Sequence, residues 1–181
     1  MTVLGEEVLG EITTQQVEIR TPTSPFSGVE LDVDDLCCVS IIRAGDSLLD
    51  CMRALLPGVS VGKILIQRDE SVAHKPAIMM YEKLPKDIQN KFVILCDPML
   101  ATGGSAHKAI ECLLKAGVPE NKIVFANVIC CPEGIEYLGK VHPLMKIITA
   151  CIDDGMNEDK YIVPGLGDYG DRYFNTTGPS C

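Results

Sequence analysis

Residues 92–117 read FVILCDPMLATGGSAHKAIECLLKAG, and they predict a strand, a loop and a helix in that order. The apolar run 92–96 is too continuous for a half-exposed strand and favours one buried on both faces of a parallel sheet. Asp97 and Pro98 end that strand, since proline cannot donate to a strand ladder. Apolar residues then repeat at helical spacing through 106–114. This order of elements is typical of an α/β fold.

The loop after this strand is a candidate phosphate site. In α/β proteins the N–H groups at a helix start, together with the helix dipole, bind anions. Gly103 and Gly104 would let a phosphate approach the backbone closely, and the hydroxyls of Thr102 and Ser105 add donors. Taken alone, these residues are as compatible with a flexible turn in which Ser105 caps the helix. Asp97 shifts the balance, because a carboxylate at the carboxyl end of a buried strand lies where open α/β sheets bind ligands.

Two familiar nucleotide-binding loops are absent from the sequence. Residues 58–63 read GVSVGK, which lacks the spacing of a P-loop, and Ile64 follows where that motif needs Ser or Thr. Residues 165–171 read GLGDYGD, but no helical pattern follows them as it would follow a dinucleotide-binding loop. The loop after the strand 92–96 is therefore of another kind.

Length and composition predict one globular domain with a single core. The chain has 181 residues, of which 46% are hydrophobic and 23% charged. Its net charge of −9 argues against nonspecific nucleic-acid binding but leaves room for an anionic substrate held by a local cationic cluster. The nine cysteines show no C-x-x-C spacing, and no signal peptide or membrane span is evident. These features favour the reducing cytosol.

Four further apolar runs predict buried strands, at 38–42, 63–67, 123–129 and 145–152. Two of these runs end in arginines, Arg43 and Arg68, whose guanidinium groups suit bidentate contacts to phosphate oxygens. Ala44 and Gly45 continue from Arg43 as a short turn that presents N–H groups at the start of the next helix. If that unit stood alone, a surface ion pair between Arg43 and a nearby aspartate would be the simpler explanation.

A hairpin is predicted where residues 77–81 return along the strand 63–67. Its charged tip, 69–76, suits a lid over an active site. His74 and Lys75 lie at this tip, where solvated loop residues are the simpler explanation.

The first 35 residues carry weaker patterns. Residues 16–21 alternate between polar and apolar types as an edge strand does, and the prolines and serines of 21–28 predict a turn. We expect no long helical region at the N-terminal end. His107 and His142 have no partners at metal-ligand spacing and are expected to be structural.

The segment 153–175, which we call the hood, breaks the alternation of strands and helices. Its part 161–174 combines glycines, aromatic residues and charges. A loop packed by its own aromatic side chains would explain this composition. The alternative is a cover for a flat base, in which backbone N–H and C=O groups read the edge of the base. Arginines after two strands, together with a phosphate loop, favour the second interpretation.

From residue 39 to residue 174 the chain resembles the uracil phosphoribosyltransferases, motif by motif. The matching motifs are IIRAG at 41–45, IQRDE at 66–70, DPMLATGGS at 97–105, CPEGI at 131–135 and YIVPGLGD at 161–168. The resemblance implies an α/β, type I phosphoribosyltransferase fold, with a five-stranded parallel core sheet flanked by helices, a β-hairpin lid and a C-terminal hood. It further implies a single domain over 1–181, with the hood formed mainly by 153–175 and a contribution from the N-terminal segment. The aromatic residue at position 169, Tyr169, resembles the residue type found there in the eukaryotic branch of the family.

The same resemblance implies the site residues. Those for 5-phosphoribosyl 1-diphosphate (PRPP) are Arg43, Ala44, Gly45, Arg68, Asp97, Pro98, Met99, Leu100, Ala101, Thr102, Gly103, Gly104, Ser105 and Asp168. Those for uracil are Ile162, Gly167, Asp168 and Tyr169. Catalytic roles fall to Arg68, Asp97 and Asp168. Members of the family commonly carry a strained peptide in the small loop here formed by 43–45.

The activity implied by the resemblance is transfer of the phosphoribosyl group of PRPP to uracil, giving UMP and pyrophosphate in pyrimidine salvage. Mg²⁺ would be held mainly by PRPP itself, with no protein metal ligand assigned. We expect a cytoplasmic homodimer or higher homo-oligomer, without nucleic-acid or membrane partners. A non-catalytic PRPP- or nucleotide-binding regulator on the same fold, and a phosphoribosyltransferase for another base, are the alternatives.

Overall fold

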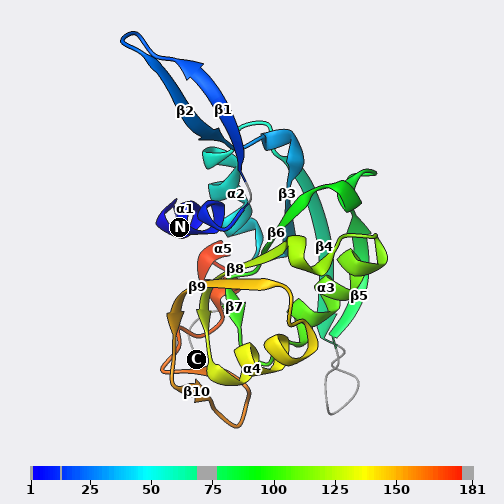
Figure 1. The fold of residues 1–181 in the computed structure, drawn as a ribbon. Coiled ribbons are helices and arrows are strands. Elements are labelled where there is room, and N and C mark those ends of the chain that lie inside the picture. Colours follow the sequence, from blue (N-terminus) through cyan, green and yellow to red (C-terminus); the bar gives the residue numbers. More distant parts are fainter. Residues whose placement is uncertain (1, 13, 69–76, 177–181) are drawn as a thin grey trace.

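The structure, a computed structural model, describes residues 2–12, 14–68 and 77–176. The strands are β1 (Gln15–Arg20), β2 (Pro25–Glu30), β3 (Leu36–Ile42), β4 (Ser60–Arg68), β5 (Ala77–Lys83), β6 (Phe92–Cys96), β7 (Met99–Leu100), β8 (Ile123–Cys130), β9 (Lys146–Ile152), β10 (Gly155–Met156) and β11 (Ile162–Val163). The helices are α1 (Thr2–Gly10), α2 (Asp46–Leu55), α3 (Gly104–Lys115), α4 (Pro132–Val141) and α5 (Tyr169–Phe174). Figure 1 shows their arrangement.

A mixed sheet forms the centre of the molecule. Its strands run in the order β5-β4-β3-β6-β8, and β9 pairs with β8. The short β7 also pairs with β8, beyond the point where β6 ends. All of these pairings are parallel except that of β5 with β4. The five predicted parallel strands are therefore confirmed as β3, β4, β6, β8 and β9.

Both faces of the sheet are buried, as the continuous apolar runs predict. Alternate residues of β3 point to opposite faces, so that Val39 and Ile41 pack with α3 and α4 while Leu36 and Cys38 pack with α1 and α2. Phe125 of β8 is fully buried on the α3 side. The helices thus enclose the sheet as in other layered α/β domains.

The N-terminal part differs from the prediction in two ways. The weak pattern of 1–35 concealed the helix α1, whose buried residues Leu4, Gly5 and Val8 face the core. A Cβ at Gly5 would collide with the side chain of Leu55, so glycine allows α1 to approach α2 closely. The predicted turn 21–28 is also too long, because Pro25–Glu30 forms β2 and pairs antiparallel with β1.

The β1–β2 hairpin projects from the rest of the molecule (Figure 1). It leaves Ile19, Phe26 and Val29 at least half exposed. This isolation explains why proline, serine and glycine are tolerated in β2, since no further strand pairs with it within the described residues.

The predicted hairpin of 63–67 with 77–81 is present as β4 and β5. The proposed lid at its tip, including His74 and Lys75, lies outside the described residues. None of the helices described is long and apolar enough to cross a bilayer.

Candidate active site

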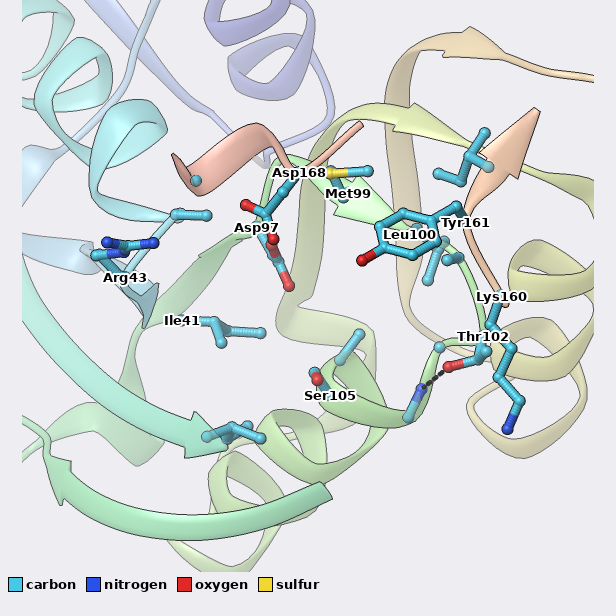
Figure 2. Close-up of a pocket in the computed structure, with 18 of the residues that line it drawn as sticks. Ile41, Arg43, Asp97, Met99, Leu100, Thr102, Ser105, Lys160, Tyr161 and Asp168 are labelled. Carbon is cyan, nitrogen blue, oxygen red and sulfur yellow. Dashed lines mark hydrogen bonds between the residues drawn. The ribbon is translucent and has the colours of Figure 1, made fainter. Parts of the chain in front are cut away.

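A cavity of about 470 Å³ opens at the carboxyl ends of the central strands. Ile66 and parts of 41–44, 97–106, 159–162 and 167–170 line it. Figure 2 shows side chains from the loop after β6, among them Asp97, Thr102 and Ser105, around the same cavity as Lys160, Tyr161 and Asp168 of the hood. The phosphate-binding loop and the hood predicted from the sequence therefore enclose one space.

The loop 102–105, which we call the phosphate loop, turns into α3 through Gly103. This glycine has a φ of +78°, in the left-handed region that glycine adopts without a steric penalty. The N–H of Gly104 donates to Thr102 Oγ1 over 3.4 Å. The loop lines the cavity at the N-terminal end of α3, where the helix dipole is positive.

Helix α4 supports the phosphate loop from behind. A Cβ at Gly134 would collide with the carbonyl oxygen of Ala101, and one at Gly103 would lie 2.8 Å from Tyr137 Cδ1. Gly134 therefore lets α4 pack directly on the backbone that precedes the loop. The motif at 131–135 thus contributes to the site through packing, without lining the cavity.

Asp97 is fixed at the end of β6 by its own backbone. Its N–H donates to the carbonyl oxygen of Ala126 over 3.2 Å, and its carbonyl oxygen accepts from Asn127 Nδ2 over 3.1 Å. Asn127 is fully buried, and its Oδ1 accepts from the Thr149 hydroxyl over 2.8 Å. A buried side chain of β8 thus locks the point where the strand gives way to the loop, and the Asp97 side chain lines the cavity.

The residues 43–45, which we call the pyrophosphate loop, follow β3 and lead into α2. The peptide bond between Ile42 and Arg43 is cis. A Cβ at Gly45 would collide with the carbonyl oxygen of Cys96 and would lie 2.7 Å from that of Ile41. Gly45 does not line the cavity, and its place in the motif follows from this close approach of two backbones.

Replacing Gly45 by alanine should destabilise the fold by about 1–3 kcal/mol, because the new methyl group meets backbone atoms that cannot rotate away. Gly10→Ala in α1 is the matched control, since a Cβ there has no atom within 4 Å. Urea unfolding of both variants provides the measurement. Equal midpoints for the two variants would show that the Gly45 loop can shift at no cost.

Arg43 extends from the pyrophosphate loop toward α5. Its Nη2 lies 2.5 Å from Asp171 Oδ1, and its Nη1 donates to Thr176 Oγ1 over 3.0 Å. Its guanidinium carbon lies 5.4 Å from the ring centroid of Phe174. The Thr176 hydroxyl, followed by Arg43, lowers the pKa of Asp171 below its ordinary value. The expected pyrophosphate arginine is therefore anchored to the last helix.

The hood folds back over the cavity through a few polar contacts. Asp153 Oδ2 accepts from the N–H of Gly165 over 2.8 Å, and Asn157 Oδ1 accepts from that of Tyr161 over 2.9 Å. Ile162 is buried against Ile129 and Cys131. Asp168 caps α5 and lines the cavity.

The cavity lining includes most of the predicted site residues. Within the described residues these are Arg43, Ala44, Asp97, Met99, Leu100, Ala101, Thr102, Gly103, Gly104, Ser105, Ile162, Gly167 and Asp168. Gly45, Pro98 and Tyr169 lie outside the lining. The Tyr169 hydroxyl instead donates to Ser47 Oγ over 3.0 Å, and its ring stacks on Tyr173. Arg68 ends β4, and its side chain is outside the described part of the chain.

The sequence reasoning did not identify eight further lining residues: Ile41, Ile42, Ile66, Ala106, Asp159, Lys160, Tyr161 and Gly170. Several of them immediately adjoin a predicted residue, which is the signal that could have found them. Lys160 is different, because it has a φ of 65°, a left-handed conformation unusual for a lysine. The sequence does not predict this backbone conformation, because lysine has no particular preference for it.

The residues at the cavity suit a magnesium ion that a substrate brings with it. No group of three or more His, Cys, Asp or Glu in the described ranges is arranged to hold a metal by itself. Among the described residues, the carboxylates that line the cavity are those of Asp97, Asp159 and Asp168. Hard oxygen donors of this kind fit Mg²⁺, which takes its remaining ligands from phosphates and water.

His107 and His142 form a pair outside the cavity lining. His107 Nδ1 lies 2.8 Å from His142 Nε2, and the edge of Tyr137 packs on His107. Burial lowers the pKa of His107. The pair joins α3 to the end of α4, in agreement with the structural role expected from the sequence.

The eight cysteines within the described residues are free thiols.

The comparisons with known proteins cover nearly the whole chain. The model of the uracil phosphoribosyltransferase family matches residues 1–176. Uracil phosphoribosyltransferase of Saccharomyces cerevisiae is 47% identical over 173 residues, which are 95% of this chain and 79% of that protein. The enzyme of the same name from Dictyostelium discoideum is 46% identical over 175 residues, 96% of this chain and 80% of that protein. The similarity to these two eukaryotic proteins agrees with the eukaryotic branch expected from Tyr169.

Other relatives are longer. Uridine kinase-like protein 5 of Arabidopsis thaliana is 46% identical over 172 residues, and these make up 94% of this chain but only 36% of that protein. The chain thus spans little more than a third of that plant relative.

Two solved structures are similar. The AQ2163 protein of Aquifex aeolicus has a TM-score of 0.85 at 30% identity, over 98% of this chain and 83% of its own. APRTase of Giardia lamblia has a TM-score of 0.50 at 15% identity, over 80% of this chain and 96% of its own, and supports the fold alone. The match to the family model and the identities to its members lead to one conclusion. The chain belongs to the uracil phosphoribosyltransferase family.

Proposed function

We propose that this chain transfers the 5-phosphoribosyl group of PRPP to N1 of uracil, giving UMP and pyrophosphate in cytoplasmic pyrimidine salvage. The observation that carries the proposal is the single cavity at which the phosphate loop, Asp97, the pyrophosphate loop and the hood meet. The cavity volume of about 470 Å³ lies within the range of small-molecule sites. The family match over residues 1–176 supports the same reaction.

The phosphate loop would hold the ribose 5-phosphate. The N–H groups of 102–105 and the hydroxyls of Thr102 and Ser105 supply donors, and the α3 dipole supplies positive potential. Asp97, which directly follows β6 and precedes the phosphate loop, would accept hydrogen bonds from the sugar hydroxyls. Together these groups would hold the sugar with its C1 toward the hood, and such positioning lowers the entropy cost of bringing the two reactants together.

The pyrophosphate loop would hold the leaving group. In the reaction the bond between C1 and the pyrophosphate oxygen breaks, its electron pair leaves with pyrophosphate, and N1 of uracil forms a bond to C1 as it loses its proton. Arg43, Arg68 and the N–H groups of the loop would stabilise the negative charge that develops on pyrophosphate. The reaction needs no protein nucleophile.

Bound Mg²⁺ would neutralise part of the charge on the leaving pyrophosphate. Of the three carboxylates that line the cavity, those of Asp97 and Asp168 would orient its water ligands. Asp168 would also face the positive charge that develops at C1. The two carboxylates reach the cavity from different parts of the chain. Asp97 directly follows β6, and Asp168 directly precedes α5.

The hood would bind uracil through backbone groups near Ile162 and 167–169. Ile162 is buried, and Gly167 has a φ of +74°, so the chain turns sharply beside the cavity. In the closed hood this turn would present N–H and C=O groups toward the base. We also propose a homodimer or higher homo-oligomer, which the exposed apolar side chains of the β1–β2 hairpin support.

The direct test measures UMP formed from radiolabelled uracil with and without PRPP and Mg²⁺. UMP that appears only when PRPP is present supports the proposal. Binding of PRPP without turnover would favour a regulator on the same fold, and turnover with a purine or with orotate in place of uracil would favour another transferase.

Arg68→Ala should lower kcat/KM for PRPP by roughly 10²-fold or more, because one charged donor to the leaving group is lost. The backbone of Arg68 lies at the end of β4, so the fold should survive. Arg53→Ala on α2 provides a control for the loss of an exposed arginine. An unchanged kcat/KM in well-folded Arg68→Ala would remove this residue from the site.

A further inference from the structure

We propose that Asp171 is a positioning residue, which acts on PRPP through Arg43 and ties the pyrophosphate loop to the hood. The inference rests on the proposed function, since it assumes that Arg43 contacts pyrophosphate. Asp171 belongs neither to the motifs described above nor to the cavity lining. Its place in the structure nevertheless connects both halves of the site.

Asp171, Arg43 and Thr176 form a closed triangle of polar contacts. Asp171 Oδ1 accepts from Arg43 Nη2 over 2.5 Å and from the Thr176 hydroxyl over 2.7 Å. Arg43 Nη1 donates to the same hydroxyl over 3.0 Å. The Phe174 ring lies against the guanidinium group and closes the arrangement from the side. Each terminal nitrogen of Arg43 therefore has a fixed partner on the last helix or just beyond it.

The backbone of Asp171 caps the start of its own helix within the hood. Its N–H donates to Asp168 Oδ1 over 2.8 Å, which caps α5 and fixes the carboxylate that lines the cavity. A Cβ at Gly170, between the two aspartates, would lie 3.5 Å from Arg43 Nη2. One residue thus contacts the expected pyrophosphate arginine with its side chain and the cavity carboxylate with its backbone.

This arrangement leaves Arg43 free to bind a substrate. A guanidinium group has five N–H donors, and the contacts to Asp171 and Thr176 use two of them. These contacts leave the other three N–H groups unused, and Arg43 lines the cavity in which we propose that pyrophosphate binds. Since the side chains of Arg43 and Asp171 are 49% and 40% exposed, their ion pair contributes little to global stability. Its effect falls on the orientation of Arg43, a side chain that otherwise loses much rotamer freedom when it binds.

The charge of Asp171 opposes this benefit, because a carboxylate near the site repels an anionic substrate. The Thr176 hydroxyl and Arg43 lower the pKa of Asp171, so it is ionised across the neutral range. Asparagine separates the two effects, since its Oδ1 still accepts from both partners while the charge is absent. If orientation dominates, Asp171→Asn should bind PRPP about as well as the unmodified chain, and Asp171→Ala should not.

The experiment measures PRPP binding by calorimetry in the presence of MgCl₂. Asp171→Ala should weaken PRPP binding about tenfold, and Asp171→Asn less than about threefold. The KM for uracil should change less than about twofold in both, because the backbone N–H that caps α5 remains. Asp154→Ala is the matched control, an exposed aspartate of the hood that is not a partner of Arg43.

A double-mutant cycle tests whether Asp171 acts through Arg43. In an Arg43→Ala background the further change Asp171→Ala should not weaken PRPP binding and should tighten it slightly, because only the repulsion by the carboxylate is then removed. A further loss of PRPP affinity in that background, or unchanged affinity in the Asp171→Ala single variant, would overturn the positioning role. An equal rise in the KM for uracil and PRPP would also overturn it, because this pattern indicates a melted α5. Failure of the unmodified chain to bind PRPP would overturn the proposed function as well.

Discussion

Uracil should be used roughly 10³–10⁴ times more efficiently than cytosine, as judged by kcat/KM. Uracil presents an N3–H donor between two carbonyl acceptors, whereas cytosine has an acceptor at N3 and a donor at position 4. Backbone groups near Ile162 and Gly167 cannot exchange donor for acceptor. Each of the two mismatches would leave a buried backbone group unpaired, at about 1–3 kcal/mol apiece.

Steady-state assays with both bases, at saturating PRPP, provide the measurement. 5-Fluorouracil is the positive control, because it keeps the hydrogen-bonding edge of uracil and adds one small atom. Tyr169→Ala should keep the preference against cytosine, since the Tyr169 hydroxyl bonds to Ser47 and its side chain does not line the cavity. Comparable kcat/KM for uracil and cytosine in the unmodified chain would be incompatible with base reading by the backbone.

Gly104→Val should weaken PRPP binding by roughly 10²–10³-fold while the fold stays intact. The valine side chain would occupy space beside the N–H groups that receive the phosphate, and the lost contacts are charge-assisted. A Cβ at Gly104 would meet only Thr102 Oγ1, at 3.7 Å, so the substitution creates little strain in the protein itself. Gly103 would be the poorer choice, because its left-handed backbone and the nearby Tyr137 would destabilise the variant.

Calorimetric titration with PRPP, together with thermal unfolding, separates these effects. Gly139→Val is the matched control, since Gly139 is an exposed glycine of α4 at which a Cβ would have no neighbouring atom within 4 Å. Both variants should unfold cooperatively, and only Gly104→Val should lose PRPP affinity. Full retention of affinity would place the phosphate elsewhere in the cavity.

The sequence predicted those parts of the fold that depend on local pattern. The strand 92–96 has the same bounds as β6, because an unbroken apolar run between turn residues allows few other structures. The helix α1 was missed because Gly5 and Gly10 weaken a nine-residue pattern whose stability comes from packing on α2. The strand β2 was missed because its proline and glycine are normally turn residues.

The predicted site residues depended on motifs, and motifs do not reveal pairings between distant segments. The contact of Arg43 with Asp171 joins residues 128 positions apart and becomes visible only when α5 is placed against the pyrophosphate loop. The sequence reasoning also treated Gly103 and Gly104 alike, whereas the structure separates a turn-forming glycine from one that leaves space. The difference between the two glycines lies in their backbone dihedral angles, which the pattern of a single sequence predicts poorly.

The sparse burial of the hood has a consequence for turnover. Only Ile162 and Gly170 are buried within 153–175, whereas every residue of β3 from Leu36 to Ile41 is buried. The free energy of local opening is lower where fewer buried contacts must be broken, so we expect the hood to open while the sheet stays folded. We therefore expect release of a nucleotide to leave the core undisturbed, with local opening of the hood as a limit on the rate at which products leave.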